Sequence, residues 1–263
     1  MKTVLITGGS SGIGFEITRY FAKAGYQILW VSLLEEELKL AQSNLKKEIP
    51  ELSLEYLTLD LSQPDAAQKV YDWVKSQPGD LEVLINNAGF GTFGFAHEIS
   101  FEKEVSMIQL NVMNLFQLTR LFLKEMLEKN TGTIINISSN TSFQPVPKMS
   151  AYAATKAFVK HYSQSLAEEM KALKTAVRVI TVCPAAIKDT PFKQAAQMNK
   201  VKTFDSFTAT TKEEVAKDVW RAFSKGKSFI ASGAGLRRVM WMAPFLPASL
   251  VQFMLRDELK EKK

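Results

Sequence analysis

Tyr152 and Lys156 are residues whose types and spacing can do acid–base chemistry, because they lie four positions apart in a helical pattern that runs from about residue 150 to 173. At that spacing both side chains project from one helix face, one turn apart. A free phenol has a pKa of about 10 and exchanges protons poorly at neutral pH, but a nearby ammonium group favours the phenolate. We therefore predict that Lys156 lowers the pKa of Tyr152, and that Tyr152 is a general acid or base. A strand pattern that ends at Ser138 and Ser139 brings a hydroxyl to the same substrate oxygen.

A glycine-rich turn lies at the start of the chain. Residues 2–7 form an apolar run of strand length, a Gly-Gly-Ser-Ser-Gly-Ile-Gly segment follows at once, and a helical pattern continues from it. Glycines let a backbone turn tightly against a pyrophosphate, and a helix that begins there presents free N–H groups to it. The alternative is an ordinary glycine-rich connection between a strand and a helix. We predict that the turn binds a dinucleotide through Gly8, Ser10, Ser11, Gly12, Ile13 and Gly14.

The tetrapeptide Asn86-Asn87-Ala88-Gly89 completes a set with these two motifs. Each motif alone is weak evidence, but the set, in this order, resembles the short-chain dehydrogenase/reductase family over about residues 2–192. The resemblance implies an α/β fold, a single doubly wound Rossmann domain with a mainly parallel sheet and its cofactor along the carboxyl ends of the strands. It also implies an NAD(P)-dependent oxidoreductase that interconverts a carbonyl and a secondary alcohol.

The resemblance assigns a role to each candidate residue. In the reduction direction Tyr152 donates a proton to the substrate oxygen, Ser139 hydrogen-bonds that oxygen, and Lys156 also holds the nicotinamide ribose. Asn111 matches a position that completes a proton relay, and the alternative for this polar residue in an apolar run is a structural hydrogen bond. The remaining cofactor contacts fall on Asp60 and Leu61 at the adenine, Asn87, Ala88 and Gly89 at the adenosine ribose, and Ile187 at the nicotinamide. The alternative for Asp60 is that it is only a turn residue.

The segment after the sixth expected strand departs from the family pattern, in which Pro-Gly precedes a threonine near the nicotinamide carboxamide. In this chain Ala185 replaces the glycine and Thr190 is displaced by one position. The role of Thr190 therefore stays open at this point.

The end of the second strand usually decides the choice of coenzyme. An acidic residue there binds the ribose 2′-hydroxyl of NAD, whereas an arginine nearby accommodates the 2′-phosphate of NADP. Ser32 and Leu33 supply neither group, and Ser11 is also neutral. Because Ser32 can donate to a phosphate and no carboxylate repels it, we predict NADP in preference to NAD.

Periodicity and capping signals give the elements around these motifs. A helix with Ser62 as its N-cap is expected to run to about residue 76, and one long helical pattern covers residues 102–128. The expected strands are 2–7, 27–32, 54–59, 81–85, 132–138, 176–183 and 228–231.

Composition excludes several other classes of protein. The chain has 263 residues, which suits one large domain, and its single cysteine, Cys183, excludes an internal disulfide framework. Two distant histidines do not indicate a metal site. The net charge of +6 is scattered over lysines and forms no basic, aromatic-interleaved stripe, so we expect no nucleic-acid partner. The chain starts directly with a strand pattern, so we expect no signal peptide and a cytoplasmic location.

The C-terminal tail is unusually apolar. We divide the chain into a dinucleotide-binding domain at residues 1–235 and an extension at 236–263. Residues 239–255 carry no formal charge, but the stretch is barely long enough to cross a bilayer, and Pro244 and Pro247 interrupt any helix. The tail is expected to cover the substrate pocket or a subunit partner, and the alternative is peripheral contact with a membrane, with Arg237 and Arg238 on headgroups.

The substrate and partners are less constrained than the chemistry. The segment Asn87-Ala-Gly-Phe-Gly-Thr-Phe-Gly94, the loop at 143–147 and the apolar tail are similar to a bacterial subgroup of ketosphinganine and long-chain 3-ketoacyl reductases, which implies an apolar carbonyl substrate. Family members commonly form homodimers or homotetramers through the helices that contain Asn111 and Tyr152.

Two other functions remain as alternatives: a non-catalytic, NADPH-binding redox sensor, and a membrane-surface interaction protein. The complete Ser139, Tyr152 and Lys156 set argues against the redox sensor.

Overall fold

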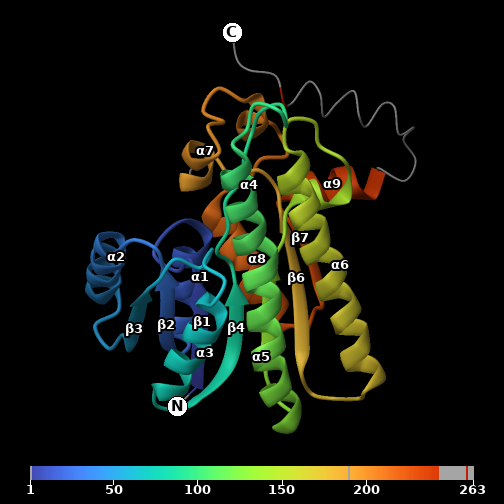
Figure 1. The fold of residues 1–263 in the computed structure, drawn as a ribbon. Coiled ribbons are helices and arrows are strands. Elements are labelled where there is room, and N and C mark those ends of the chain that lie inside the picture. The colour runs from blue at the N-terminus through green and yellow to red at the C-terminus, as the bar shows by residue number, and fades with distance from the viewer. Residues whose placement is uncertain (1, 189, 243–258, 260–263) are drawn as a thin grey trace.

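A parallel β-sheet forms the centre of the molecule (Figure 1). The computed structural model describes residues 2–188, 190–242 and 259. Within these residues the sheet has seven strands in the order β3-β2-β1-β4-β5-β6-β7, so the expected doubly wound fold is confirmed. The chain order reverses between β1 and β4, which is where such sheets bind dinucleotides. The strands are β1 (Lys2–Thr7), β2 (Gln27–Ser32), β3 (Leu54–Thr58), β4 (Asp80–Asn86), β5 (Thr133–Ile137), β6 (Arg178–Pro184) and β7 (Phe229–Ser232).

Helices cover both faces of the sheet, and each face has its own apolar core. Side chains of α1, α2 and α8 pack on one face with Val4 and Ile6 of β1, whereas side chains of α3, α5 and α6 pack on the other with Leu5. This alternation along β1 is the period of two expected for a strand buried on both sides. The helices are α1 (Gly12–Lys23), α2 (Glu35–Glu48), α3 (Ala66–Ser76), α4 (Phe101–Ile108), α5 (Leu115–Glu128), α6 (Ser150–Ala172), α7 (Pro191–Ala195), α8 (Lys212–Ser224) and α9 (Ala234–Met242).

Two helix predictions need correction. The pattern at residues 102–128 is not one α-helix, because a π-helical turn, Gln109–Asn114, joins α4 to α5. Ser62 does not cap α3: its N–H and hydroxyl both donate to the Asp60 carboxylate, at 2.9 and 2.7 Å, and the helix begins three residues after Gln63. The short polar side chain of Ser62 is therefore used in the turn after β3 and is not available to the helix.

The C-terminal prediction is only partly covered by the described residues. The division after residue 235 falls inside α9, where Leu236 is buried against the core. Arg237, which the membrane alternative places on lipid headgroups, donates to Asp218 at 2.8 Å. Residues 243–258 and 260–263 lie outside the described residues, but Leu259 packs with the apolar cluster near Tyr152. In the described part of the chain, no helix combines the length and apolar character that crossing a membrane requires.

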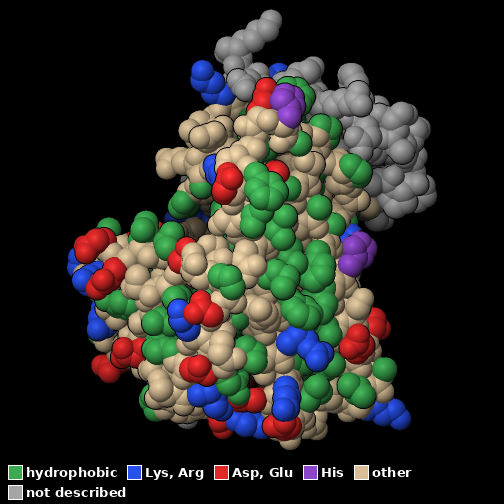
Figure 2. All heavy atoms as spheres, in the orientation of Figure 1, with side chains coloured by type: hydrophobic (Ala, Val, Ile, Leu, Met, Phe, Trp, Pro, Cys, Tyr) green, Lys and Arg blue, Asp and Glu red, His purple; other side chains and the backbone are tan. Residues whose placement is uncertain are grey.

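An apolar surface lies over α4, α5 and α6 (Figure 2). Phe101, Val105 and Ile108 are 42–76% exposed and follow the spacing of one helix face, and Met113 continues the line into the π-helical turn. Phe158 of α6 is 40% exposed and stacks on Tyr162, which in turn contacts Phe116 of α5. We call this set, Phe101, Val105, Ile108, Met113 and Phe158, the α4–α6 apolar surface.

Candidate active site

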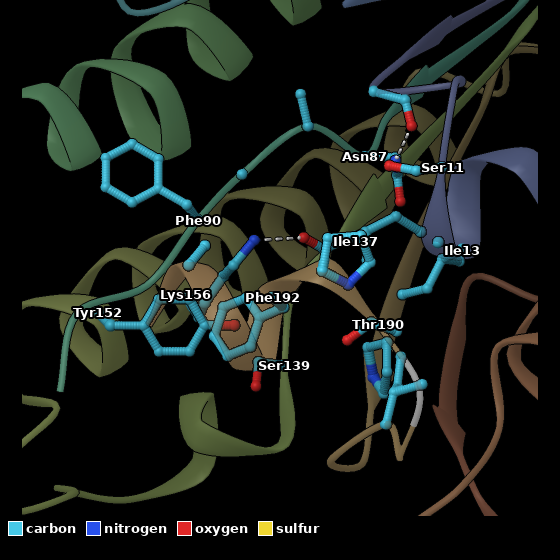
Figure 3. A pocket seen from close by; sticks show the side chains of 18 of the residues that line it. Ser11, Ile13, Asn87, Phe90, Ile137, Ser139, Tyr152, Lys156, Thr190 and Phe192 are labelled. Carbon is cyan, nitrogen blue, oxygen red and sulfur yellow. Dashed lines mark hydrogen bonds between the residues drawn. The ribbon is translucent and has the colours of Figure 1, made fainter. Parts of the chain in front are cut away.

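A cleft of about 430 Å³ lies at the carboxyl ends of the strands and collects most of the predicted site residues (Figure 3). Its walls come from the turns after several strands and from α6, which is the arrangement that the sheet order predicts. Three predicted residues, Gly14, Asp60 and Asn111, do not line the cleft. The predicted residues that do line it are Gly8, Ser10, Ser11, Gly12, Ile13, Ser32, Leu61, Asn87, Ala88, Gly89, Ser139, Tyr152, Lys156 and Ile187.

The glycine-rich turn has the geometry of a phosphate cradle. Gly8 and Gly12 have φ values of 65° and 54°, which a side chain would strain. A Cβ on Gly14 would lie 2.2 Å from the Gly8 carbonyl oxygen, so Gly14 allows α1 to start against the turn although it does not face the cleft. Ser11 stands at the N-cap of α1 without a side-chain capping bond. The first N–H groups of α1 therefore meet the cleft at the positive end of the helix dipole.

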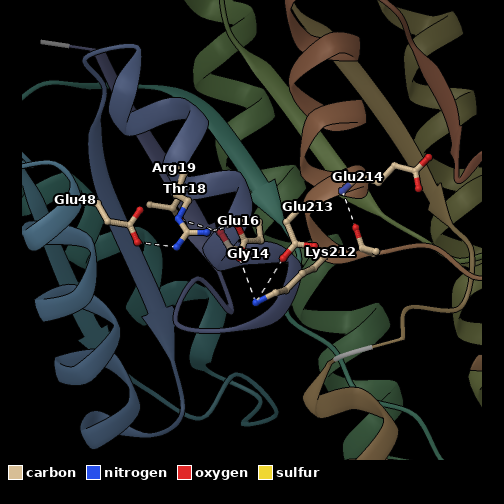
Figure 4. Close-up of polar contacts among 9 residues, drawn as sticks. Gly14, Glu16, Thr18, Arg19, Glu48, Lys212, Glu213 and Glu214 are labelled. Carbon is tan, nitrogen blue, oxygen red and sulfur yellow. Dashed lines mark hydrogen bonds and ion pairs between the residues drawn. The ribbon is translucent and has the colours of Figure 1, made fainter.

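Ion pairs fix α1 behind this turn (Figure 4). The Glu16 carboxylate is 5% exposed and pairs with both Arg19 and Lys212, the latter at 3.2 Å. Arg19 also pairs with Glu48 of α2 at 2.7 Å. A buried carboxylate needs such partners, so these contacts hold α1 against α2 and against the start of α8.

Asn87 joins the turn to the end of β4. Its side-chain amide donates to the carbonyl oxygens of Thr7 and Gly8, both at 3.0 Å. The Thr7 hydroxyl accepts from the backbone N–H groups of Asn87 and Ala88, also at 3.0 Å. The predicted cofactor residue Asn87 therefore shapes the cradle with its side chain and faces the cleft from β4.

Asn111 lies in the π-helical turn and holds the segment after β4 at Phe90, which lines the cleft. Its amide donates to the Phe90 carbonyl at 2.9 Å and to the Thr155 hydroxyl at 3.2 Å, and its Oδ1 accepts from the Phe90 N–H at 3.2 Å. A Cβ on Gly89 would lie 2.8 Å from that oxygen, which explains the glycine. The side chain of Asn111 thus has the structural role that we weighed as the alternative. π-Helical turns occur frequently at functional sites, and the proton-relay role stays a prediction.

Tyr152 and Lys156 lie side by side on α6 and are both buried. Lys156 donates from Nζ to the Ile137 carbonyl oxygen at 3.0 Å, and this nitrogen is 5.9 Å from the centre of the Tyr152 ring (Figure 3). Burial lowers the pKa of Lys156 to about 8. Burial also raises the pKa of Tyr152 to about 12, against a smaller lowering by a hydrogen bond with the Ser139 side chain.

The predicted lowering of the Tyr152 pKa by Lys156 is therefore wrong for this structure. The cost of removing a phenolate from water exceeds the effect of an ammonium group that lies 5.9 Å from the ring. Tyr152 is consequently a neutral phenol at pH 7, which is the form that donates a proton.

The two adjacent serines have different partners. Ser138 donates its hydroxyl to the Lys156 carbonyl oxygen at 2.7 Å, so it fixes α6 to the end of β5. The Ser139 hydroxyl instead donates to the Asn140 side-chain oxygen and accepts from the Thr141 N–H, both at 3.2 Å. Ser139 lines the cleft together with Tyr152, and its role toward a substrate stays a prediction.

The adenosine end of the cleft contains Ser10, Ser32 and Leu61. The Asp60 carboxylate accepts from Ser62 and Gln63 within its own turn, and the hydrogen bonds from Ser62 hold the pKa of Asp60 below its ordinary value. The turn role therefore accounts for the Asp60 side chain.

The opposite end of the cleft is apolar. Phe192 of α7 lies with its ring centre 5.2 Å from that of Tyr152, and a Cβ on Gly91 would lie 2.6 Å from the Phe192 ring. Ile187 and Thr190 line the cleft beside it, and Ile187 is tied to Thr210 by a β-bridge. The cluster around Tyr152 is Met107, Val146, Met149, Ala153, Ala196, Met198, Val201 and Phe204, with Phe90, Phe93, Phe192 and Leu259 packed against it.

The family model for short chain dehydrogenase matches residues 2–200, which is most of the chain. The chain belongs to the short-chain dehydrogenase family. A relative from Salmonella typhi, named NADP-dependent 3-hydroxy acid dehydrogenase YdfG, is 34% identical over 223 residues, which is 82% of this chain and 87% of the relative. The rat very-long-chain 3-oxoacyl-CoA reductase is 32% identical over 215 residues, or 79% of this chain and 64% of that protein.

Solved structures of short-chain dehydrogenases have the same fold. The enzyme from Sphingobium yanoikuyae, solved with NADPH, has 27% identity and a TM-score of 0.81, with 100% of this chain and 98% of that chain covered. The actinorhodin polyketide ketoreductase, also solved with NADPH, has 27% identity and a TM-score of 0.77, with 89% and 97% covered. This short-chain dehydrogenase is therefore an NAD(P)-dependent dehydrogenase or reductase, and the non-catalytic alternative is not retained.

The cleft of this short-chain dehydrogenase fits its coenzyme. A dinucleotide backbone has room along the strand ends. That room is left by the left-handed Gly8 and Gly12, by the start of α1, and by the small Ala88 and Gly89. The motifs did not indicate Glu37 or Phe192, which also line the cleft. The helical period of α2 does not show which of its three consecutive glutamates faces the cleft, and Phe192 lies in a segment without a clear pattern.

Proposed function

We propose that this short-chain dehydrogenase reduces apolar, acyl-chain ketones to secondary alcohols with NADPH. The observation that carries the proposal is the placement of the buried Tyr152 phenol inside an apolar cluster, on the wall of a cleft that Ser139 also lines. The NADP named for the Salmonella relative, and the NADPH named for the Sphingobium and actinorhodin enzymes, support NADPH as the coenzyme. The absence of a carboxylate at Ser32 and Leu33 supports it further.

The residues of the chain divide the reaction between them. A bound reduced nicotinamide supplies the hydride that adds to the carbonyl carbon. Tyr152 donates its phenolic proton to the carbonyl oxygen, so that hydride and proton together give the alcohol. Ser139 donates a hydrogen bond to the same oxygen, and Lys156, oriented by the Ile137 carbonyl, supports the ribose and the phenol. Asn111 is proposed to support proton resupply from its π-helical turn.

The charge distribution of the cleft supports a neutral substrate. Among the described residues that line it, Glu37 and Lys156 carry a formal charge, and Lys156 is engaged with Ile137. The walls near Tyr152 are Phe90, Val146, Met149, Phe192, Met198 and Phe204, with Leu259 from the tail. A carboxylate buried there would have no cation to pair with. The rat relative, which is named for very-long-chain 3-oxoacyl-CoA, supports an acyl-chain ketone.

A matched pair of substrates tests this specificity. We expect a long-chain 3-keto ethyl ester to have a kcat/KM at least about tenfold higher than the corresponding free 3-keto acid, because the acid must bury an unpaired charge. The measurement is NADPH oxidation at several concentrations of each compound. Equal or faster turnover of the free acid would show that a cation reaches the substrate and would refute the apolar specificity, while leaving the reductase chemistry intact.

We also propose that the protein forms a homodimer or homotetramer through the α4–α6 apolar surface. Phe101, Val105, Ile108, Met113 and Phe158 are each at least 40% exposed, and Phe158 contacts the partly buried ring of Tyr162, which contacts that of Phe116. Exposed apolar side chains that cluster on one surface mark an interaction site, whereas apolar side chains that are scattered singly need no such explanation.

A charge inside this surface should separate the subunits. We expect Val105→Glu to lower the sedimenting mass in analytical ultracentrifugation, because a carboxylate would be buried without a partner at the interface. Leu173→Glu is the matched control, since Leu173 is 63% exposed and lies beyond the end of α6, outside the apolar surface. An unchanged mass for Val105→Glu would show that this surface is not the interface.

The location of the protein remains a proposal. A cytoplasmic location is supported by the single cysteine, Cys183, which is buried and free. Peripheral membrane contact through residues 239–255 concerns mostly residues outside the described part of the chain.

A further inference from the structure

Three side chains from separate elements meet at the adenosine end of the cleft. The hydroxyl of Ser10, in the glycine-rich turn, lies 3.0 Å from the hydroxyl of Ser32 at the end of β2. The same Ser10 hydroxyl lies 3.0 Å from the carboxylate of Glu37, in the first turn of α2. All three residues line the cleft. A carboxylate therefore reaches the coenzyme site from α2, although the end of β2 itself has none.

The Ser10 hydroxyl is the donor in both contacts, to the Ser32 hydroxyl and to the Glu37 carboxylate. A serine hydroxyl has one proton to donate, and an ionised carboxylate only accepts, so the Ser10 proton is shared between these two acceptors. The Ser10 hydroxyl is therefore not available as a donor to an anion in this arrangement. Ser32, which the sequence suggests as the donor to a phosphate, belongs to the same hydrogen-bond network as the Glu37 carboxylate.

The charge of Glu37 has no compensating cation in the cleft wall. Lys156 is the one positively charged residue among the described residues that line the cleft, and it is held at the Ile137 carbonyl near Tyr152. Leu33 and Leu34, the residues after β2, are 60% and 57% exposed and bring no charge. In this fold the region just after β2 is where a 2′-phosphate or 2′-hydroxyl is recognised.

We propose that Glu37 limits the selectivity of this protein for NADPH over NADH. Its carboxylate repels a dianionic 2′-phosphate and engages the Ser10 hydroxyl, whereas it accepts a hydrogen bond from an uncharged ribose 2′-hydroxyl. The proposal rests on the proposed NADPH-dependent function and names the residue that sets its coenzyme preference. NADPH binding thus requires the Ser10 bond to Glu37 to be exchanged for one to phosphate.

The test is a fluorescence titration of Glu37→Gln with NADPH and with NADH. Glutamine has nearly the same shape and removes the charge, so we expect the Kd for NADPH to fall about tenfold and that for NADH to change less than about threefold. Glu36→Gln is the matched control, because it makes the same change of net charge on a side chain that is 94% exposed. It should shift both Kd values by less than about twofold.

A competition experiment isolates the 2′-phosphate. In Glu37→Gln, 2′,5′-ADP should displace bound NADH about tenfold more effectively than in wild type, while displacement by 5′-AMP should change less than about threefold. Equal shifts for both competitors, or no shift for either, would overturn the role of Glu37. If wild-type protein bound neither NADPH nor NADH, the proposed function itself would fail, and this outcome is distinct because it appears before any substitution.

Discussion

Tyr152→Phe is expected to reduce the turnover of an apolar ketone by about a thousandfold and to leave the Kd for NADPH within about twofold, because positioned proton donors contribute on this scale. The substitution removes the phenolic proton donor and keeps the ring that packs against Phe192. Turnover would be followed by NADPH oxidation and binding by nicotinamide fluorescence. The two measurements together separate loss of chemistry from loss of the coenzyme.

Tyr162→Phe is the control for this experiment. Tyr162 is on the same helix, and its hydroxyl is buried without a hydrogen-bond partner in the described structure. Removal of that hydroxyl should leave turnover near normal. If Tyr152→Phe turned over as fast as Tyr162→Phe, the assignment of Tyr152 as the proton donor would be wrong.

Lys156→Met is expected to weaken NADPH binding about tenfold and turnover about a hundredfold, since the proposed contact of its ammonium group with the ribose both binds the coenzyme and positions the nicotinamide for hydride transfer. Methionine keeps a linear side chain in a buried position, so the fold should remain intact by circular dichroism. Lys160→Met is the control one turn along the helix, where the lysine lies over the Phe143 ring. If Lys156→Met bound NADPH normally, the ribose role of Lys156 would be refuted.

The affinity for NADPH should depend on pH, because the charge of Lys156 changes near its pKa. Burial lowers the pKa of Lys156 to about 8, so the group is charged below that pH and becomes neutral above it. NADPH affinity should therefore fall as the pH rises from about 7 to about 9, and Lys156→Met should lose this dependence. A wild-type affinity that is flat through this range would contradict a charged Lys156 at the ribose.

Most of the site residues that the sequence predicts lie at the carboxyl ends of parallel strands or on α6. Ser32 ends a strand, and Gly8, Asn87 and Ser139 lie one or two residues after one. A parallel sheet brings those strand ends to one edge. The helical spacing of Tyr152 then places it beside them. The topology of the sheet thus converts spacing along the chain into proximity in space.

Other features depend on burial and on the rotation of helices, which local patterns do not specify. Glu37 is one of three consecutive glutamates in α2, and the packing of that helix decides which of them faces the cleft. The raised pKa of Tyr152 results from its burial, whereas the spacing to Lys156 indicated the opposite shift. The π-helical turn at Asn111 changes a helical pattern by too little to be seen in the sequence.

The measurement that tests the central claim most directly follows the hydride itself. Wild-type protein would be incubated with a long-chain 3-keto ester and NADPH that carries deuterium at the transferable position of the nicotinamide, and the product analysed by mass spectrometry. The account predicts a secondary alcohol with one deuterium on the carbinol carbon, formed by wild type and Tyr162→Phe and nearly absent with Tyr152→Phe. Failure of wild-type protein to form labelled alcohol from any ketone of an apolar panel, while it binds NADPH, would contradict the account.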